Sequence, residues 1–466
     1  MSGLLLRDAE LGGSRRADVR VRDGIVARVA PSLERLPGEE VLDCGGAAVI
    51  PGLCDHHLHL HAMAAARSSV RCGPPDVRTA GELTETLRAA VPDENGWIRG
   101  TGYFESVAGD LDAIALDAMR PDVPVRVQHR SGALWVLNSA ALAAVGAAGG
   151  TEPHPGIERD ADGRATGRLW RADDWLRDRL GSRTLPSLAA VGADLLGYGI
   201  TAVTDATPDL DAAAITSISD AMLRRELPPR VHLLGVPLGA SIPRTQGLTV
   251  GPYKIVLADS GMLTYPELAG RITAAHEAGR AVAVHCVTLE ALVLLLAALQ
   301  DVGTRQGDRI EHGGIVPENV IDDLAHLGVR VVTQPGFLAD RGDDFLRDLP
   351  AGEHADLYRC GSLLRAGVRV ALSSDAPYGP PDPWAVLAAA VSRRTASGRV
   401  AGPAERVAYG DALAAYLGPP DDPGGPPCRV AVGSPADLVV FRVPFAALPG
   451  CPTPVRAVLT ARRLAG

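Results

Sequence analysis

Four histidines stand close together near the start of the chain: His56, His57, His59 and His61. Side chains two residues apart on a β-strand point to the same side, so His57 and His59 can bind one metal ion together. His59 and His61 satisfy the same geometry, and a solvated, histidine-rich surface tract is the third interpretation. The cluster follows an apolar, strand-like segment, which favours the metal site.

Three further side chains that can bind a metal each end an apolar run: His285, His312 and Asp375. A single histidine in such a position is more often a satisfied core residue than a ligand. Taken together they favour a common site, because the carboxyl ends of the strands of one parallel barrel lie on the same side.

Lys254 is the single lysine among 46 basic residues. An arginine stays protonated in a protein, whereas a buried lysine amine can lose its proton. A neutral amine can react with carbon dioxide to form a carbamate, a carboxylate-like group able to bridge two metal ions. The alternative is that a codon bias removed the other lysines and that Lys254 forms an ordinary ion pair. The apolar run continues after Lys254, which places this residue early in its strand.

Apolar, strand-like segments that alternate with helical patterns must position these residues. Eight such segments can be counted, as in a (β/α)₈ TIM barrel, which is an α/β fold. They span residues 47–55, 199–204, 231–236, 253–258, 281–286, 309–312, 329–333 and 368–373.

Both ends of the chain are rich in short β-like runs. We expect residues 1–48 and 428–466 to form one small β-sandwich domain, and residues 49–417 to form the barrel. Residues from about 70 to 185 are too many for a barrel crossover, so we expect an insertion after the first strand, with a strand of its own at 123–128. The proline- and glycine-rich segment 418–427 is the expected linker between barrel and terminal sheet.

Composition limits the class of partner. The 466 residues are 46% hydrophobic and 22% charged, with a formal net charge of −9, which argues against nucleic acid or an anionic membrane surface as partner. We therefore expect a small-molecule substrate. The seven cysteines form no C-x-x-C pair, and the N-terminus lacks the pattern of a signal peptide, so we expect a cytoplasmic protein without disulfides. A homo-oligomer is compatible with the sequence.

The motifs as a set resemble the amidohydrolase superfamily of metal-dependent hydrolases, and most closely its branch that includes N-substituted formamide deformylase. The resemblance covers nearly the whole chain. It rests on residues 51–59, on His285 and His312, on Asp375 within Ser-Ser-Asp-Ala-Pro, and on segments 97–103, 138–142, 163–167, 382–384 and 432–440.

This resemblance implies a TIM barrel with a β-sandwich built from both termini, and one or two divalent metal ions, usually zinc. It implies hydrolysis of a C–N bond in an amide, formamide, carbamate or cyclic amide by a metal-activated hydroxide, with Asp375 as general base and acid. The implied ligands are His57, His59, Lys254 as a carbamate, His285, His312 and Asp375.

Substrate contacts are less specific in the sequence. The candidates are Arg130, Trp170 and Arg171 in the insertion and Gln334 after the seventh strand, whereas Glu311 is expected to support the site.

Two alternatives remain open. A mononuclear deaminase of a heterocycle usually carries His-x-x-Glu after the fifth strand, where this chain has His285-Cys-Val-Thr. A catalytically silent ligand-binding barrel would lack ligands, whereas the full set can be assigned here.

Overall fold

The computed structural model describes residues 3–148, 154–180, 185–258, 261–451 and 454–464. Two compact units make up the chain: Met1–Leu60 with Ser187–Gly466, and His61–Pro186. None of the helices in the described ranges has the length and apolar composition that a membrane crossing requires.

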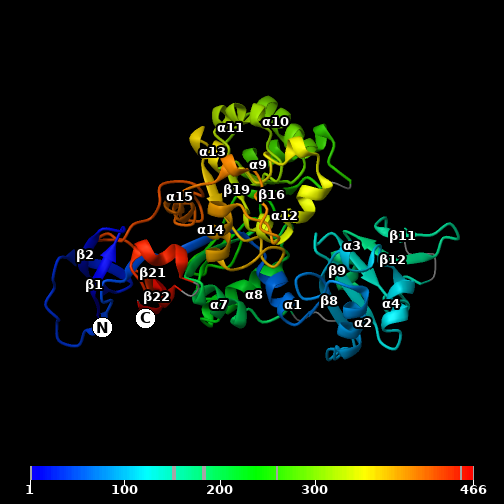
Figure 1. Ribbon diagram of the computed structural model, residues 1–466, viewed down its shortest axis with the longest axis horizontal. Coiled ribbons are helices and arrows are strands. Elements are labelled where there is room, and N and C mark those ends of the chain that lie inside the picture. The colour runs from blue at the N-terminus through cyan, green and yellow to red at the C-terminus, as the bar shows by residue number, and fades with distance from the viewer. Residues whose placement is uncertain (1–2, 149–153, 181–184, 259–260, 452–453, 465–466) are drawn as a thin grey trace. The chain divides into compact units, whose positions relative to one another are not determined.

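Parallel strands of the first unit form a sheet of four strands, in the order β15-β14-β13-β6, and a sheet of five, in the order β16-β17-β18-β19-β20. Eight of them overlap the eight predicted segments in sequence order, and helices separate most of them, so the arrangement is TIM-barrel-like (Figure 1). The strands are β6 (Leu53–Leu58), β13 (Ile200–Asp205), β14 (Arg230–Leu233), β15 (Leu248–Val250), β16 (Tyr253–Val256), β17 (Val282–Cys286), β18 (Arg309–His312), β19 (Arg330–Thr333) and β20 (Val370–Leu372).

The two faces of the five-stranded sheet differ in chemistry. Paired residues on neighbouring strands share a face. One face is apolar and packs against helices α9 (Tyr265–Glu277), α10 (Leu289–Val302), α11 (Ile321–Leu327) and α13 (Gly361–Arg365). Its strand residues are Ile255, Val282, Val284, Cys286, Ile310, Val331 and Val370. The opposite face, called the inner face below, carries Lys254, Ala283, His285, Arg309, Glu311, Arg330 and Val332.

Two long helices of the first unit begin at recognisable caps. Thr264 and Glu267 form a capping box at the start of α9, and the Thr288 hydroxyl accepts a backbone N–H at the start of α10. The longest apolar run, residues 291–299, lies in α10 and packs on the apolar face. The helices are α7 (Ala189–Gly197), α8 (Ala212–Leu223), α9 (Tyr265–Glu277), α10 (Leu289–Val302), α11 (Ile321–Leu327), α12 (Gly336–Asp348), α13 (Gly361–Arg365), α14 (Pro383–Ser392), α15 (Tyr409–Ala414) and α16 (Ala461–Leu464).

Strands from both ends of the chain share one seven-stranded sheet, in which the blue N-terminal and red C-terminal strands lie side by side (Figure 1). The predicted first segment, 47–55, is in fact divided: β5 belongs to this terminal sheet and β6 to the barrel-like part, with Gly52 between them. The form of a separate β-sandwich stays a prediction. The strands are β1 (Leu4–Leu11), β2 (Arg15–Arg22), β3 (Ile25–Ala30), β4 (Glu40–Asp43), β5 (Ala48–Pro51), β21 (Leu438–Phe441) and β22 (Val455–Leu459).

The second unit has a six-stranded sheet in the order β11-β12-β10-β9-β8-β7. Its strands are β7 (Val70–Arg71), β8 (Ile98–Tyr103), β9 (Val125–His129, over the expected strand at 123–128), β10 (Leu134–Leu137), β11 (Ile157–Arg159) and β12 (Ala165–Trp170). The helices from the unit boundary onward are α1 (Leu60–Arg67), α2 (Ala80–Ala89), α3 (Glu105–Ala108), α4 (Ala113–Met119), α5 (Ser139–Ala144) and α6 (Asp173–Arg179).

Candidate metal centre

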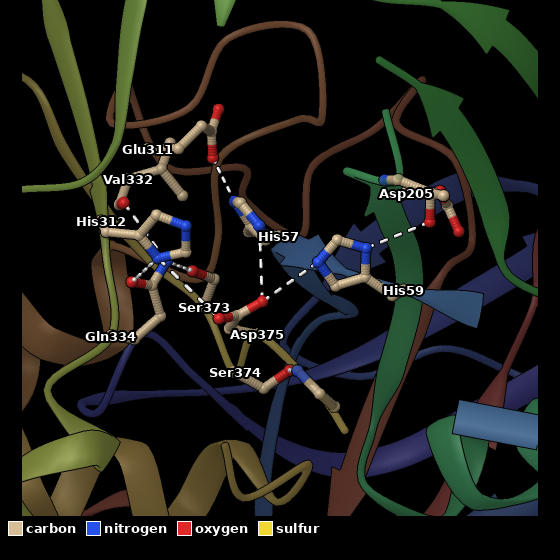
Figure 2. A network of polar contacts seen from close by, with 12 residues as sticks. His57, His59, Asp205, Glu311, His312, Val332, Gln334, Ser373, Ser374 and Asp375 are labelled. Atoms are coloured by element: carbon tan, nitrogen blue, oxygen red, sulfur yellow. Dashed lines mark hydrogen bonds and ion pairs between the residues drawn. The ribbon is translucent and has the colours of Figure 1, made fainter. Parts of the chain in front are cut away.

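His57, His312 and Asp375 meet at the carboxyl ends of β6, β18 and β20. Each offers a ligand atom, and the three atoms lie within 4.8 Å of one another in a buried setting. His57 Nε2 is 3.4 Å from Asp375 Oδ1, and His312 Nδ1 is 3.8 Å from Asp375 Oδ2. Figure 2 shows the Asp375 carboxylate between the imidazoles. This is the geometry of a group that can hold a divalent cation.

His59 approaches the same carboxylate from the end of β6. Its Nε2 lies 3.2 Å from Asp375 Oδ1, and its Nδ1 lies 3.1 Å from the Thr207 hydroxyl oxygen. His57 and His59 therefore both face Asp375, as their spacing of two residues on a strand predicts (Figure 2).

A buried carboxylate orients His57. Glu311 accepts a hydrogen bond from His57 Nδ1 through one oxygen and from Arg309 Nε through the other. All three side chains are buried. With its proton on Nδ1, the His57 ring presents Nε2 as a metal ligand, and the carboxylate increases the basicity of that nitrogen.

An amide orients His312 in the same way. Gln334 Oε1 accepts from His312 Nδ1 at 2.9 Å, while Gln334 Nε2 donates to the Ser373 hydroxyl at 2.9 Å and to the Val332 carbonyl at 3.3 Å. Gln334, predicted above to contact substrate, is buried and makes these three contacts, and its role in substrate binding stays a prediction. His312 Nε2 is thereby left as the ligand nitrogen.

Two of these residues have left-handed backbone conformations. The φ angle is 73° at His312 and 54° at Asp375, where side chains other than glycine are uncommon. In register His312 pairs with Cys286, which belongs to the apolar outer face, yet its ring lies 4.7 Å from the His57 ring centroid. The positive φ ends the strand and turns the imidazole toward the site, a local strain of the kind found at functional sites.

Lys254 and His285 lie on the inner face beside this cluster. The His285 ring centroid is 4.4 Å from that of His312. Lys254 is buried, with 5% of its surface exposed, and its charge acts on both His57 and His312. Its strand ends at Val256, so the residue is closer to the strand end than the apolar run in the sequence implies.

Burial sets the protonation states of the cluster. It lowers the pKa of His57 well below the usual value, with a further contribution from Lys254, and it lowers the pKa of His312. Burial also lowers the pKa of Lys254, against the opposing charge of nearby carboxylates. For Asp375, burial acts to raise the pKa, but His59 and the other two imidazoles outweigh it and hold the pKa below the usual range. Neutral imidazoles with an ionised carboxylate are the forms that bind metals.

Two buried ligand atoms of the cluster give a second reason why its residues fit a divalent metal. His57 Nε2 and Asp375 Oδ1 are buried, and neither makes a hydrogen bond of normal geometry with the described residues. Buried polar atoms without a partner are costly, and a cation between them would satisfy both.

Asp55 belongs to the site region and is missed by the sequence analysis. It is 1% exposed and accepts backbone N–H groups from His57 and Ser374. Burial raises the pKa of this carboxyl to about 7. An acidic residue two positions before the histidine pair is the signal that could have found it.

Arg130, Trp170 and Arg171 lie in the second unit. There the Arg130 guanidinium stacks over Phe104, and the Trp170 indole nitrogen donates to Glu158 at 3.2 Å. Their role in substrate binding stays a prediction.

Comparison with known protein sequences identifies a family and two relatives. The amidohydrolase family matches residues 40–461 of the chain. N-substituted formamide deformylase of Arthrobacter pascens is 29% identical over 460 residues, covering 85% of this chain and 84% of that protein. The putative amidohydrolase YtcJ of Bacillus subtilis (strain 168) is 27% identical over 441 residues, covering 82% and 81%.

Among solved structures, an uncharacterized metal-dependent hydrolase from Pyrococcus horikoshii OT3 has the same fold. Its TM-score is 0.70 at 20% sequence identity, and the match covers 89% of this chain and 91% of that one.

Proposed function

Because this chain belongs to the amidohydrolase family, we propose that it uses a divalent metal to hydrolyse an amide, formamide, carbamate or cyclic amide in a small molecule. The observation that carries the proposal is the buried group of His57, His312 and Asp375 at the strand ends. The relative that acts on N-substituted formamides supports a C–N bond as the one that is cleaved.

The proposed metal ligands are the imidazoles of His57, His59, His285 and His312 with the Asp375 carboxylate. A metal bound there supplies a Lewis acid that polarises a carbonyl and lowers the pKa of water, and zinc suits a site rich in imidazole.

Asp375 is the proposed general base. Its carboxylate is ionised and lies next to the imidazoles, where it can take a proton from the attacking water and deliver it to the leaving nitrogen. The Gln334 and Glu311 contacts restrict the rotation of the His312 and His57 rings, and His57 Nε2 thereby keeps its direction toward Asp375.

Lys254 is the proposed bridge between two ions. Its burial favours the neutral amine, whose Nζ can attack the carbon of carbon dioxide with loss of one proton to give a carbamate. The resulting anion would balance the positive charge of two cations.

Metal analysis and a substrate screen test the function together. Protein purified without chelator should carry about two divalent ions per chain, and about one if the carbamate is absent. Screening N-formyl, N-acyl and cyclic amide compounds should reveal metal-dependent hydrolysis that a chelator removes and added Zn²⁺ restores. Absence of bound metal, or activity that survives complete metal removal, would contradict the proposal.

Lys254→Arg tests the carbamate directly. Arginine stays protonated and cannot react with carbon dioxide, so we expect activity to fall by at least about 100-fold and the metal content to drop to about one ion. Lys254→Ala is the matched variant, because a small added carboxylate such as acetate can replace the missing carbamate and restore part of the activity. Wild-type activity in Lys254→Arg would refute the bridging role, and a carbamate signal in the ¹³C NMR spectrum with labelled bicarbonate would support it.

A further inference from the structure

β6 and β20 meet at a seam between the four-stranded and the five-stranded sheet. Each of the two strands is the last in its own sheet, and among the described residues no β ladder connects them. Lower along the strands, Cys54 N donates to Tyr416 O at 2.8 Å and Leu372 N donates to Ala415 O at 3.2 Å. Residues 415–416 therefore lie between β6 and β20 at this level and keep the strands apart.

Nearer the carboxyl ends of the strands, the segments that carry the proposed metal ligands come together. Asp375 N donates to His57 O at 2.8 Å, and His59 N donates to Ala376 O at 2.9 Å. These two backbone bonds align Asp375 with the histidine pair. Because residues 415–416 separate β6 from β20, no regular ladder between these strands fixes the position of Asp375 relative to His57 and His59.

The Asp55 carboxylate lies between β6 and the segment after β20 and contacts the backbone of both. Ser374 N lies 3.2 Å from each of its oxygens, and His57 N donates to Oδ1 at 3.1 Å. One side chain thus binds the backbone of a first-strand ligand and the backbone beside Asp375. Because Asp55 is buried, water has no access to replace it, and both N–H groups would lose their acceptor if it were removed.

We propose that Asp55 is a positioning residue, which sets the separation of His57 and Asp375 by holding His57 N and Ser374 N on one carboxylate. This inference rests on the proposed metal-dependent function. Asp55 acts through these backbone groups, and metal binding and ligand geometry depend on it. Outer residues that orient metal ligands typically change metal affinity by about 10–100-fold when replaced.

Asp55→Asn tests the inference, because asparagine has almost the same volume but one acceptor oxygen. Asp18→Asn is the matched control: Asp18 is also buried and also accepts two backbone N–H groups, from Asp8 at 2.9 Å and Leu33 at 2.8 Å, but it lies in the terminal sheet. Zn²⁺ affinity is measured by competition with a chromophoric chelator, and ligand geometry by the absorption bands of bound Co²⁺. Thermal unfolding of the metal-free proteins reports the general loss of stability.

We expect both variants to lower the melting temperature, but only Asp55→Asn to weaken Zn²⁺ binding, by about 10–100-fold, and to shift the Co²⁺ bands. Equal Zn²⁺ affinity and an unchanged Co²⁺ spectrum in Asp55→Asn would overturn the inference while leaving the proposed function intact. If the wild-type protein binds neither ion, the proposed function itself fails. Asp55→Ser, which keeps a smaller acceptor, replaces the asparagine variant if that variant does not fold, with the same expected and contrary results.

Discussion

The two faces of the five-stranded sheet β16–β20 differ, although they belong to the same short strands. Ile255, Ile310 and Val331 on the outer face pack against helices, whereas Lys254, Arg309 and Glu311 on the inner face bring charge into the protein. Because side chains alternate along a strand, an apolar outer-face residue and a charged inner-face residue are direct neighbours in the sequence. The outer face supplies apolar burial, and the inner face can carry chemistry because the outer face already stabilises the sheet.

Two arginines of the inner face are paired with carboxylates, as burial requires. Arg309 is bound to Glu311, and Arg330 Nη2 lies 2.5 Å from Asp422 Oδ1. Such pairs add little net stability, but removing one partner leaves a buried charge without compensation. Neighbouring residues on opposite faces should therefore respond differently to substitution.

The largest effect is expected for Glu311→Gln on the inner face. The change removes the charge that compensates Arg309 and weakens the contact that orients His57. We expect a loss of about 3–5 kcal/mol in the free energy of unfolding and Zn²⁺ binding weakened by about 10–100-fold. Urea unfolding and chelator competition measure the two quantities. An unchanged Zn²⁺ dissociation constant would show that Glu311 does not orient His57.

A stability effect without a site effect is expected for Ile310→Ala, one residue earlier and on the outer face. Ile310 is fully buried, so the cavity should cost about 2–5 kcal/mol in the free energy of unfolding. Below the unfolding transition, Zn²⁺ affinity should equal that of the wild type. Weaker Zn²⁺ binding in the folded variant would mean that the two faces are not independent.

The smallest effect is expected for His232→Gln on β14, outside the ligand set. Burial, with Arg309 nearby, lowers the pKa of His232 to about 3, whereas the unfolded value is about 6.5. Below about pH 6.5 the unfolded state binds more protons, so this group removes stability as the pH falls, by about 2 kcal/mol at about pH 5.

In His232→Gln the difference in unfolding free energy between about pH 7.5 and about pH 5 should shrink by that amount. An equal pH dependence in wild type and His232→Gln would show that the His232 ring is not kept neutral by burial.

Much of the site follows from the sequence because it depends on local patterns. Apolar runs located the strands, and the residues that end them, His285, His312 and Asp375, lie where parallel strands bring distant parts of the chain together. The spacing of His57 and His59 by two residues placed both on one side. These features depend on strand periodicity and strand direction, which a sequence displays.

The remainder depends on tertiary contacts that local patterns do not contain. Alternation along β18 assigns His312 to the outer face, and only its left-handed φ turns it to the site. The role of Gln334 depends on Ser373, which is 39 residues away along the chain. Asp55 works through Ser374, at a separation of 319 residues. No periodicity in the sequence connects such pairs.

Gly52 has a consequence for protein engineering. It is the single residue between β5 of the terminal sheet and β6, and a Cβ added there would lie 2.0 Å from the Thr201 hydroxyl oxygen. Its N–H donates to the Asp437 carbonyl directly before β21 of the terminal sheet, and the next N–H, of Leu53, donates to the Gly199 carbonyl directly before β13. No flexible linker therefore separates the two sheets at this point. The terminal sheet is not a detachable module, and a truncation or domain exchange at this junction would displace the strand that carries His57.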